Sequence, residues 1–421
     1  MSAKLSRRNL LQKSAATAIA GTAAALTARI SSARELTSPP PAKGVDYYAK
    51  LGVTPFINAA GTYTVLTAST TPEEVQAAIA LASLQPVNLI ELQDAAGEYL
   101  AKRLKCEAAL ITSGAAAALT VGTAACMTHG NADAILAIPT DLGSLKNEVL
   151  VQKTHRYGYD HALRNCGIKF VEVESLDDYE KAFNEKTVMA HFFNAAEGKI
   201  SREDWLRVAY KHSVPCFNDA AADVPPISNL WAYTQMGFDL VTFSGGKGLR
   251  GPQCTGLLLG RKDLIAAAKA NNSPNSNTVG RGLKVAKEEI VGLVAAVDWF
   301  LAQDDAAMQT EYQQRADLIA GKLKTLPTVQ TQTFVPPVAN HVPHLVISYD
   351  QAKIKISAPG VMQQMRAGKP RIELNPSTGG APASAGLPGG SNVVVVGVWM
   401  LQPGEDAIVA QRLYDVLHSA L

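Results

Sequence analysis

Short apolar runs alternate with amphipathic stretches through the middle of this chain. Runs rich in valine, leucine, isoleucine and phenylalanine are typical of buried strands, and they lie at 134–138, 149–152, 169–173, 188–193, 214–218 and 240–244. A further predicted strand, within 107–119, leads directly into an alanine-rich helix. Stretches with helical spacing, such as 178–183 and 202–212, separate these runs. Strands alternating with helices predict an α/β fold with a mostly parallel, doubly wound sheet and helices on both faces.

The pattern changes after a strong predicted helix at 288–300. A second helix at 307–326 is followed by shorter strands at 344–349 and 393–398 and by a last helix at 405–421. We therefore predict a large domain over 76–302 and a smaller α+β domain over 303–421. In this division residues 1–33 form a signal peptide, and residues 34–75 form a linker and N-terminal segment.

The first residues are typical of an export signal. Arg7 and Arg8 precede the weakly apolar, alanine-rich run 15–26, which is shorter than the roughly 20 residues that span a bilayer. An arginine pair before a short apolar core indicates the twin-arginine route, and small residues offer a cleavage site after Ala33. We expect a periplasmic protein that is exported folded, with its cofactor acquired beforehand, and that has no stable membrane anchor.

Composition argues against several other functions. The formal net charge is +2 and no basic tract is present, so nucleic acid is not expected as a partner. The cysteines lack C-x-x-C and zinc spacing, which predicts neither a metal site nor a disulfide framework. We expect small buried hydrophobic residues at most of these positions: Cys106, Cys126, Cys166, Cys216 and Cys254.

The most informative segment surrounds Lys247. The apolar run 240–244 ends in Ser-Gly-Gly-Lys247, and a glycine-rich loop and a second apolar run follow. A lysine between glycines at the end of a buried strand is typical of a residue that anchors pyridoxal 5'-phosphate (PLP) through a Schiff base. On this segment alone, a solvated turn lysine is an equal alternative.

Two further positions match what PLP requires. A buried carboxylate must keep the pyridine nitrogen protonated, and Asp219 stands at the carboxyl end of the predicted strand 214–218, where ligands of such sheets bind. The phosphate requires backbone N–H donors at a helix N-terminus, and the turn Ser113-Gly114-Ala115 before the alanine-rich helix offers them. The alternatives are an aspartate that caps a turn and a simple helix cap.

The ring of the cofactor also needs a stacking face and a partner for its oxygen. His155 and Tyr157 follow the predicted strand 149–152, and we prefer His155 for the stacking role, although a solvated loop histidine is an alternative. Asn194, after the strand 188–193, is the candidate for the ring oxygen.

The remaining candidates are anion-binding groups. Ser244 is a further candidate for a phosphate contact. Arg281 and Lys284 form another candidate pair, whose side chains would reach the phosphate of a neighbouring subunit; the alternative is that both are surface charges. A substrate carboxylate needs an arginine, for which Arg371 is the first candidate and Arg366 the second.

Four segments together carry a family resemblance. The motifs Asn-Ala-Ala-Gly-Thr at 58–62, Ala-Ala-Leu-Ile-Thr-Ser-Gly-Ala-Ala-Ala at 108–117, Asp219-Ala-Ala and Phe-Ser-Gly-Gly-Lys-Gly-Leu-Arg-Gly-Pro-Gln at 243–253 resemble fold-type-I PLP enzymes related to L-seryl-tRNA(Sec) selenium transferase, in particular the D-glucosaminate-6-phosphate ammonia-lyase-like branch. The resemblance runs from about residue 45 to the C-terminus. It implies Lys247 as the cofactor lysine, Asp219 as the ring-nitrogen partner and a homodimer or larger assembly. Many relatives carry His or Gln where this chain has Ala222, so another residue must contact the ring oxygen.

The resemblance implies a lyase that acts on a small amino acid or amino-sugar acid through a Lys247 aldimine and a Cα carbanion. A racemase, an epimerase or an aminotransferase starts from the same chemistry and stays an alternative, as does a PLP-binding protein without turnover. We expect no tRNA substrate, because only the signal and a linker precede Tyr47.

Overall fold

The computed structural model describes residues 44–380 and 386–421, so the predicted twin-arginine signal and its cleavage site after Ala33 lie outside the described residues. The chain divides into two compact units, residues 1–55 and 56–421. The described part of the first unit holds helix α2 (Tyr47–Leu51), whose first turn is capped by Asp46. Among the described helices, none combines the length and the apolar character that crossing a membrane requires.

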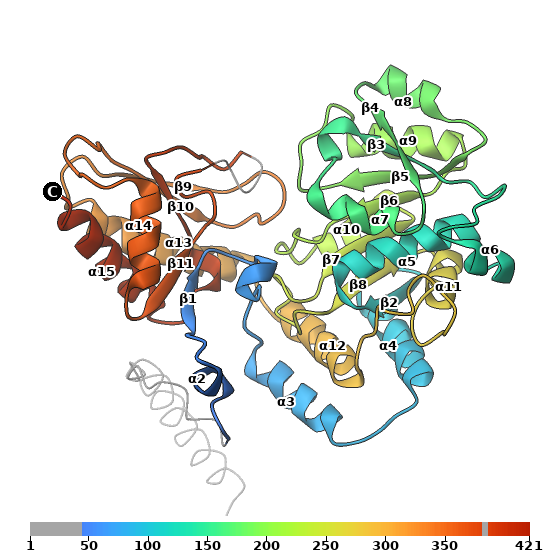
Figure 1. The fold of residues 1–421 in the computed structure, drawn as a ribbon, viewed down its shortest axis with the longest axis horizontal. Coiled ribbons are helices and arrows are strands. Elements are labelled where there is room, and N and C mark those ends of the chain that lie inside the picture. Colours follow the sequence, from blue (N-terminus) through green and yellow to red (C-terminus); the bar gives the residue numbers. More distant parts are fainter. Residues whose placement is uncertain (1–43, 381–385) are drawn as a thin grey trace, which may run out of the picture. The chain divides into compact units, whose positions relative to one another are not determined.

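A seven-stranded sheet forms the centre of the larger part of the second unit (Figure 1). Its strand order is β2-β8-β7-β6-β5-β3-β4, and the pairs from β7 through β4 are parallel, whereas β8 runs antiparallel to β2 and β7. The strands span Ala108–Thr112 (β2), Glu148–Gln152 (β3), Lys169–Val173 (β4), Thr187–Phe193 (β5), Cys216–Asp219 (β6), Leu240–Ser244 (β7) and Gly256–Gly260 (β8). The predicted fold class, a mostly parallel α/β sheet, is confirmed.

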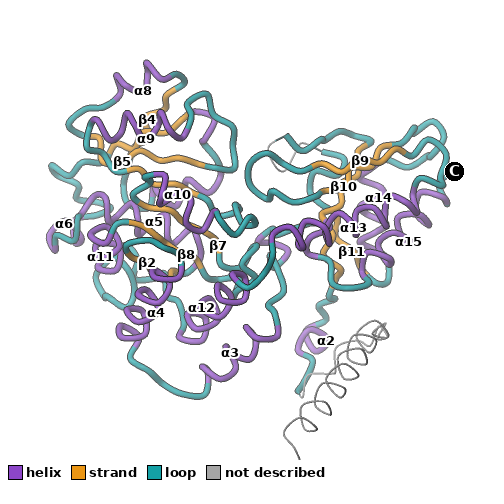
Figure 2. Tube along the Cα trace, turned by 180° about the vertical axis from the view of Figure 1, so that it is seen from behind, coloured by secondary structure: helices purple, strands orange, loops and turns teal. Residues whose placement is uncertain are grey.

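Helices flank this sheet on both faces, as both views show (Figures 1 and 2). Side chains alternate across a strand, so Leu110 and Leu240 pack with one face while their neighbours Ile111 and Val241 pack with the other. The helices of the Leu110 face are α5 (Gly114–Thr128), α7 (His161–Arg164) and α11 (Lys262–Ala270). Those of the Ile111 face are α4 (Leu89–Arg103), α8 (Leu176–Ala182), α9 (Arg202–Lys211), α10 (Asn229–Met236) and α12 (Lys287–Leu301), and α3 (Glu73–Ser83) packs on α12.

One predicted strand is wrong. Residues 134–137 of this run lie in helix α6 (Ala132–Ala137), which begins where the Asn131 side chain accepts the Ala134 N–H at 3.0 Å. A five-residue apolar run has no distinctive period, and the capping asparagine is the signal that decides between strand and helix.

The C-terminal part of this unit has its own sheets and its own core. Strands β9 (Gln330–Phe334), β10 (His344–Ser348) and β12 (Val393–Gly397) form an antiparallel sheet in the order β12-β10-β9. Strand β1 (Phe56–Ala59) pairs in parallel with β11 (Arg371–Leu374). Helices α13 (Asp305–Leu323), α14 (Ala358–Ala367) and α15 (Glu405–His418) complete it. Ile57 and Ala59 of β1 are buried in this second core, which the sequence pattern did not indicate.

Four single-turn 3-10 segments complete the described elements: η1 (Thr64–Leu66), η2 (Lys153–His155), η3 (Gly158–Asp160) and η4 (Val398–Met400). The domain boundaries predicted from the sequence stay a prediction. The hydrophobic cores nevertheless change near the predicted boundary at 303, since the core residues of α12 pack on the large sheet and most of those of α13 pack in the second core.

Candidate active site

Most of the predicted site residues lie at one edge of the large sheet. Strands β3, β5, β6 and β7 are parallel and end at the same edge. Strand β2 also ends there, because its last residue Thr112 pairs with Gly256 of β8, which in turn pairs with Ser244 at the end of β7. Open α/β sheets bind ligands at this edge.

The turn that carries Lys247 is held tightly in place. The Gly245 N–H donates to the Thr255 carbonyl at 2.8 Å. A Cβ atom at Gly245 would lie 2.1 Å from the Thr255 Oγ1, and one at Gly248 would lie 2.0 Å from the Val224 carbonyl oxygen. Glycine is therefore required on both sides of the lysine, because neighbouring backbone and side chains fill the space that any other residue would need.

Lys247 itself is half-buried, and no hydrogen bond of its Nζ is found among the described residues. Burial lowers the pKa of the amine, while the negative charges of Asp219 and Asp223 act in the opposite direction. A lowered pKa increases the neutral fraction of the amine near pH 7, and the neutral amine is both the nucleophile and the base.

Asp219 ends strand β6 and is buried. One carboxylate oxygen accepts the Ala221 N–H at 3.0 Å, and the other accepts a short hydrogen bond from the Tyr157 hydroxyl. Burial raises the pKa of Asp219, and no described lysine or arginine forms an ion pair with it. A protonated pyridine nitrogen would supply the missing positive partner, so Asp219 fits the ring-nitrogen role that the sequence predicted.

The turn between β2 and α5 fits a phosphate group. Ser113 precedes the 15-residue helix α5, yet its side chain does not cap the helix, and Gly114 has a φ of +83°. Residues 113–115 are half-buried rather than enclosed. A hydroxyl and the N–H groups of the first helical turn are thus available to an anion at the positive end of the helix.

The structure does not favour His155 for the stacking role. His155 has no exposed surface, its ring lies edge-on to Phe192 at 4.5 Å between centroids, and its Nδ1 accepts the Phe193 N–H at 3.3 Å. Burial lowers the pKa of His155 to about 4. The half-buried Tyr157, which stacks on Phe193 and contacts Asp219, is the aromatic residue at the edge of the site, so the preference for His155 stays without support.

Asn194 and Ser244 both lie at the expected edge. Asn194 is buried, its N–H donates to the Asp219 carbonyl at 3.0 Å, and its Oδ1 accepts from Arg202 Nε at 2.9 Å. Its Nδ2 has no hydrogen-bond partner among the described residues. Ser244 is half-buried, and its N–H donates to the Ala221 carbonyl at 3.3 Å. Their roles toward the cofactor stay predictions.

Arg371 lies outside this edge, on β11, and is already paired. Its guanidinium donates to Glu373, which is fully buried and also accepts from Arg366 Nε at 2.6 Å. A buried carboxylate needs such compensation, so both arginines are engaged in stabilising Glu373. The assignment of Arg371 or Arg366 to the substrate carboxylate therefore stays a prediction that this geometry does not support.

Sequence reasoning missed one acid of the site. Asp223 is buried four residues after Asp219, in the loop that follows β6, and its carboxylate accepts from the Tyr233 hydroxyl at 3.0 Å. The available signal was a second acid directly after the alanines 220–222, in a segment with little reason to be solvated.

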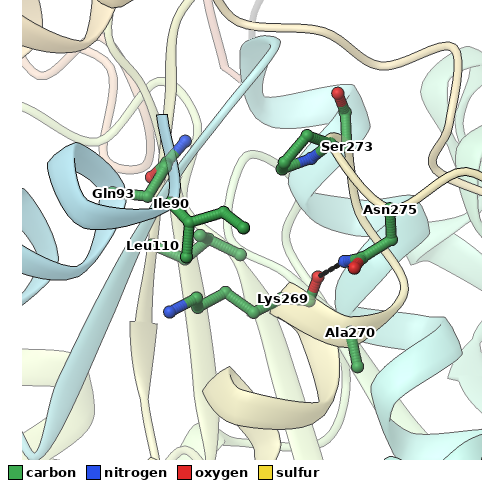
Figure 3. A pocket seen from close by; sticks show the side chains of 8 residues that line it. Ile90, Gln93, Leu110, Lys269, Ala270, Ser273 and Asn275 are labelled. Carbon is green, nitrogen blue, oxygen red and sulfur yellow. Dashed lines mark hydrogen bonds between the residues drawn. The ribbon is translucent and has the colours of Figure 1, made fainter. Parts of the chain in front are cut away.

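A separate surface pocket of about 230 Å³ lies between α4 and the loop after α11 (Figure 3). Ile90, Gln93, Leu110 and Lys269 line it, and the Asn275 Nδ2 donates to the Lys269 carbonyl at 2.9 Å. None of the predicted site residues lines this pocket, so it is distinct from the constellation around Lys247. Among the described residues no cluster of metal-binding side chains is present.

The sheet order, the lysine turn and the acid at the neighbouring strand end define a PLP-dependent enzyme of fold type I. Residues 56–314 match the L-seryl-tRNA selenium transferase (SelA) family, and the chain belongs to this family. Its cofactor is therefore PLP, which Lys247, Asp219 and the Ser113 turn fit.

Individual relatives are enzymes with different reactions. A 5'-C-glycyluridine monooxygenase-decarboxylase of a Streptomyces species is 28% identical over 342 residues, which cover 78% of this chain and 83% of that protein. A D-glucosaminate-6-phosphate ammonia lyase of Salmonella typhimurium is 31% identical over 286 residues, which cover 65% of this chain and 75% of that protein.

Solved structures give the same relation. A D-glucosaminate-6-phosphate ammonia-lyase structure superposes with a TM-score of 0.75 at 26% identity, covering 89% of this chain and 99% of that chain. The cysteine desulfurase CsdA from Escherichia coli, at 14% identity and a TM-score of 0.54, covers 83% of this chain and 93% of its own, and it shows the fold alone.

Proposed function

We propose that this protein is a PLP-dependent lyase of the α,β-elimination or ammonia-lyase type that acts on a small amino acid or amino-sugar acid. The observation that carries the proposal is the placement of Lys247 and the buried Asp219 at the ends of adjacent parallel strands. The similarity to an ammonia lyase supports the reaction class.

Each described residue has a distinct task in this proposal. The N–H groups after Ser113 would hold the phosphate, and Asp219 would keep a proton on the ring nitrogen. PLP, when bound, supplies an electron-accepting ring that stabilises negative charge at the substrate Cα. Lys247 would hold the cofactor through its Nζ, and the neutral form of that amine would serve as the base for the Cα proton of the substrate.

Borohydride reduction followed by peptide mapping tests the anchor. We expect a pyridoxyl label on Lys247 and a visible absorption band that is lost in Lys247→Ala. Lys269→Ala, which removes the lysine of the separate pocket, is the matched control and should keep both the label and the band. A label on another lysine, or no label at all, would overturn the assignment of the site.

Incubation of the loaded enzyme with amino acids and amino-sugar acids in D2O separates the reaction classes. Keto acid with free ammonia supports the lyase, and inverted chirality with deuterium at Cα indicates a racemase. Transfer of the amino group to a keto acid indicates an aminotransferase. Release of carbon dioxide with consumption of oxygen would match the chemistry named for the Streptomyces relative instead.

Export and assembly complete the proposal. The arginine pair Arg7 and Arg8 before an alanine-rich run supports export of the folded protein to the periplasm by the twin-arginine route. The family resemblance implies a homodimer or larger homo-oligomer. Fractionation of cells with and without an Arg7→Lys/Arg8→Lys substitution tests the route, because the double lysine form should stay in the cytoplasm.

A further inference from the structure

A second buried carboxyl group lies beside the lysine turn. Asp223 is 4% exposed, and one carboxylate oxygen accepts from the Tyr233 hydroxyl at 3.0 Å. The other oxygen, Oδ1, is buried without a hydrogen-bond partner among the described residues. The Asn229 side chain donates to the Asp223 carbonyl at 2.7 Å, which fixes the backbone of this loop.

The loop of Asp223 packs directly on the turn of Lys247. The carbonyl oxygen of Val224, the next residue, lies only 2.0 Å from where a Cβ atom of Gly248 would stand. No side chain fits between the two segments. The negative charges of Asp219 and of Asp223 both raise the pKa of the Lys247 amine against the effect of burial.

The charged and titratable groups around Asp223 act on its ionisation in both directions. Burial raises the pKa of Asp223 to about 6, and the neighbouring Asp219 raises it as well. The hydrogen bond from the Tyr233 hydroxyl and the positive charge of the Arg202 guanidinium lower it. Arg202 lies 5.6 Å from the Tyr233 ring centre and donates to Asn194, so a positive charge is held near this carboxyl. Asp223 is therefore ionised above about pH 6.

The two acids near Lys247 differ in what they can do once the cofactor is bound. Asp219 would hold the ring nitrogen, and the positive charge there would neutralise the Asp219 carboxylate. Asp223 has no ion pair among the described residues, and it remains the negative group that acts on the lysine nitrogen. The two carboxyl groups thus act on different nitrogen atoms: Asp219 on that of the ring and Asp223 on that of Lys247.

We propose that Asp223 is a positioning residue that keeps a proton on the Lys247 nitrogen while the cofactor is attached there. A negative charge in a buried environment favours the protonated nitrogen over the neutral one. This inference rests on the role of Lys247 given under the proposed function.

A pH titration of the visible absorption band of the PLP-loaded protein tests the inference without any substrate. The midpoint of the spectral change reports loss of the proton at the lysine nitrogen. We expect Asp223→Asn to lower this midpoint by about one pH unit or more, because one charge is removed from a low-dielectric neighbourhood. Asp223→Glu should restore most of the shift.

Asn229→Ala is the matched control. It removes the hydrogen bond to the Asp223 backbone but leaves the carboxyl group in place, so it should lower stability without moving the midpoint. Tyr233→Phe provides a second test if Asp223→Asn does not fold. It removes the hydrogen bond that lowers the pKa of Asp223, so a smaller fraction of this carboxyl is ionised at a given pH. The midpoint should therefore fall, but by less than in Asp223→Asn.

Borohydride mapping distinguishes the two possible failures. If Lys247 carries the label but Asp223→Asn leaves the midpoint unchanged, the role of Asp223 is overturned and the proposed function stays intact. The same conclusion follows from an unchanged midpoint in Tyr233→Phe if only that variant folds. Absence of a label on Lys247 in the unaltered protein overturns both. An equal shift of the midpoint in Asn229→Ala would mean that the position of the loop, not the charge of the carboxyl, sets the protonation.

Discussion

At the scale of single residues, the site depends on two buried carboxyl groups with different surroundings. Asp219 has a hydrogen bond on each of its oxygens, whereas Asp223 has a side-chain donor on one oxygen alone. Burial raises the pKa of both groups. Such groups reduce the stability of the cofactor-free protein at neutral pH, because ionising a buried acid is costly when its positive partner is absent.

The stability of the cofactor-free protein should therefore depend on pH through Asp223. Its pKa is about 6 in the folded chain against an ordinary value of 3.8. Between these two pH values the native state keeps a proton on Asp223 that the unfolded state has lost. The contribution to stability is complete below about pH 4 and is lost as pH rises to about 6. Asp223→Asn removes the carboxyl group and with it this pH-dependent loss of stability. The change in the free energy of unfolding caused by the substitution should be more favourable at pH 7 than at pH 4, by a quantity on the order of 3 kcal/mol.

Urea unfolding of both proteins at pH 4 and at pH 7 measures the difference. Asp177→Asn is the control, because that carboxyl is exposed and paired with Lys181 at the surface. It should show little change between the two pH values. The same Asp223→Asn effect at both pH values would contradict the raised pKa.

At the scale of elements, strand ends were the predictable part of the site. Apolar runs locate β3, β5, β6 and β7 in the sequence, and parallel strands share a carboxyl edge, so the sequence alone predicts that Asp219 and Lys247 lie close together. What the sequence could not supply was side-chain direction. His155 and Tyr157 are two positions apart, and the choice between them depends on packing against Phe192 and Phe193.

The missed elements lacked local signals of a similar kind. Strands β1 and β11 have four residues each and pair with one another from distant parts of the chain, so neither makes a periodic pattern alone. The pairing of Arg371 and Arg366 with Glu373 was invisible for the same reason, because it depends on which residue of β11 turns inward. Helix α14 did carry a signal, since Ser357 caps it and a proline follows in its first turn.

Helix α5 provides a prediction that separates binding from folding. Ser113 does not cap the helix, so Ser113→Ala should leave the free energy of unfolding unchanged. It should weaken PLP binding by about tenfold or more, the usual loss when a hydrogen bond to a charged group is removed. Absorbance titration of the cofactor-free protein with PLP measures the affinity.

Ser175 is the matched control for this helix terminus. Its side chain accepts the Asp178 N–H at 3.1 Å and caps α8, so Ser175→Ala should lower stability by about 1 kcal/mol and leave PLP affinity unchanged. If the two serine variants behave alike in both measurements, the turn before α5 is a structural feature and not the phosphate site.

At the scale of the whole molecule, the beginning of the second compact unit belongs to its C-terminal core. Ile57 and Ala59 of β1 are buried against β11 and its neighbours, and the Asn375 side chain donates to the Ala60 carbonyl at 2.9 Å. The chain thus leaves this core at its start and returns to it only after the large sheet is complete. The C-terminal core is therefore built from both segments.

Ile57→Ala tests this arrangement. The side chain is 6% exposed, and its truncation should reduce the free energy of unfolding by about 2–4 kcal/mol. Val65→Ala lies a few residues further along and is 88% exposed, so its effect should stay within about 0.5 kcal/mol. Equal effects in urea unfolding would show that β1 contributes little to the second core.

The contact between Gly248 and the Val224 carbonyl has a consequence for how this scaffold can change. Because no side chain fits there, any residue other than glycine at position 248 would push the segment with the lysine away from the segment with the second acid. The spacing of the amine and the acid therefore depends on keeping glycine at position 248.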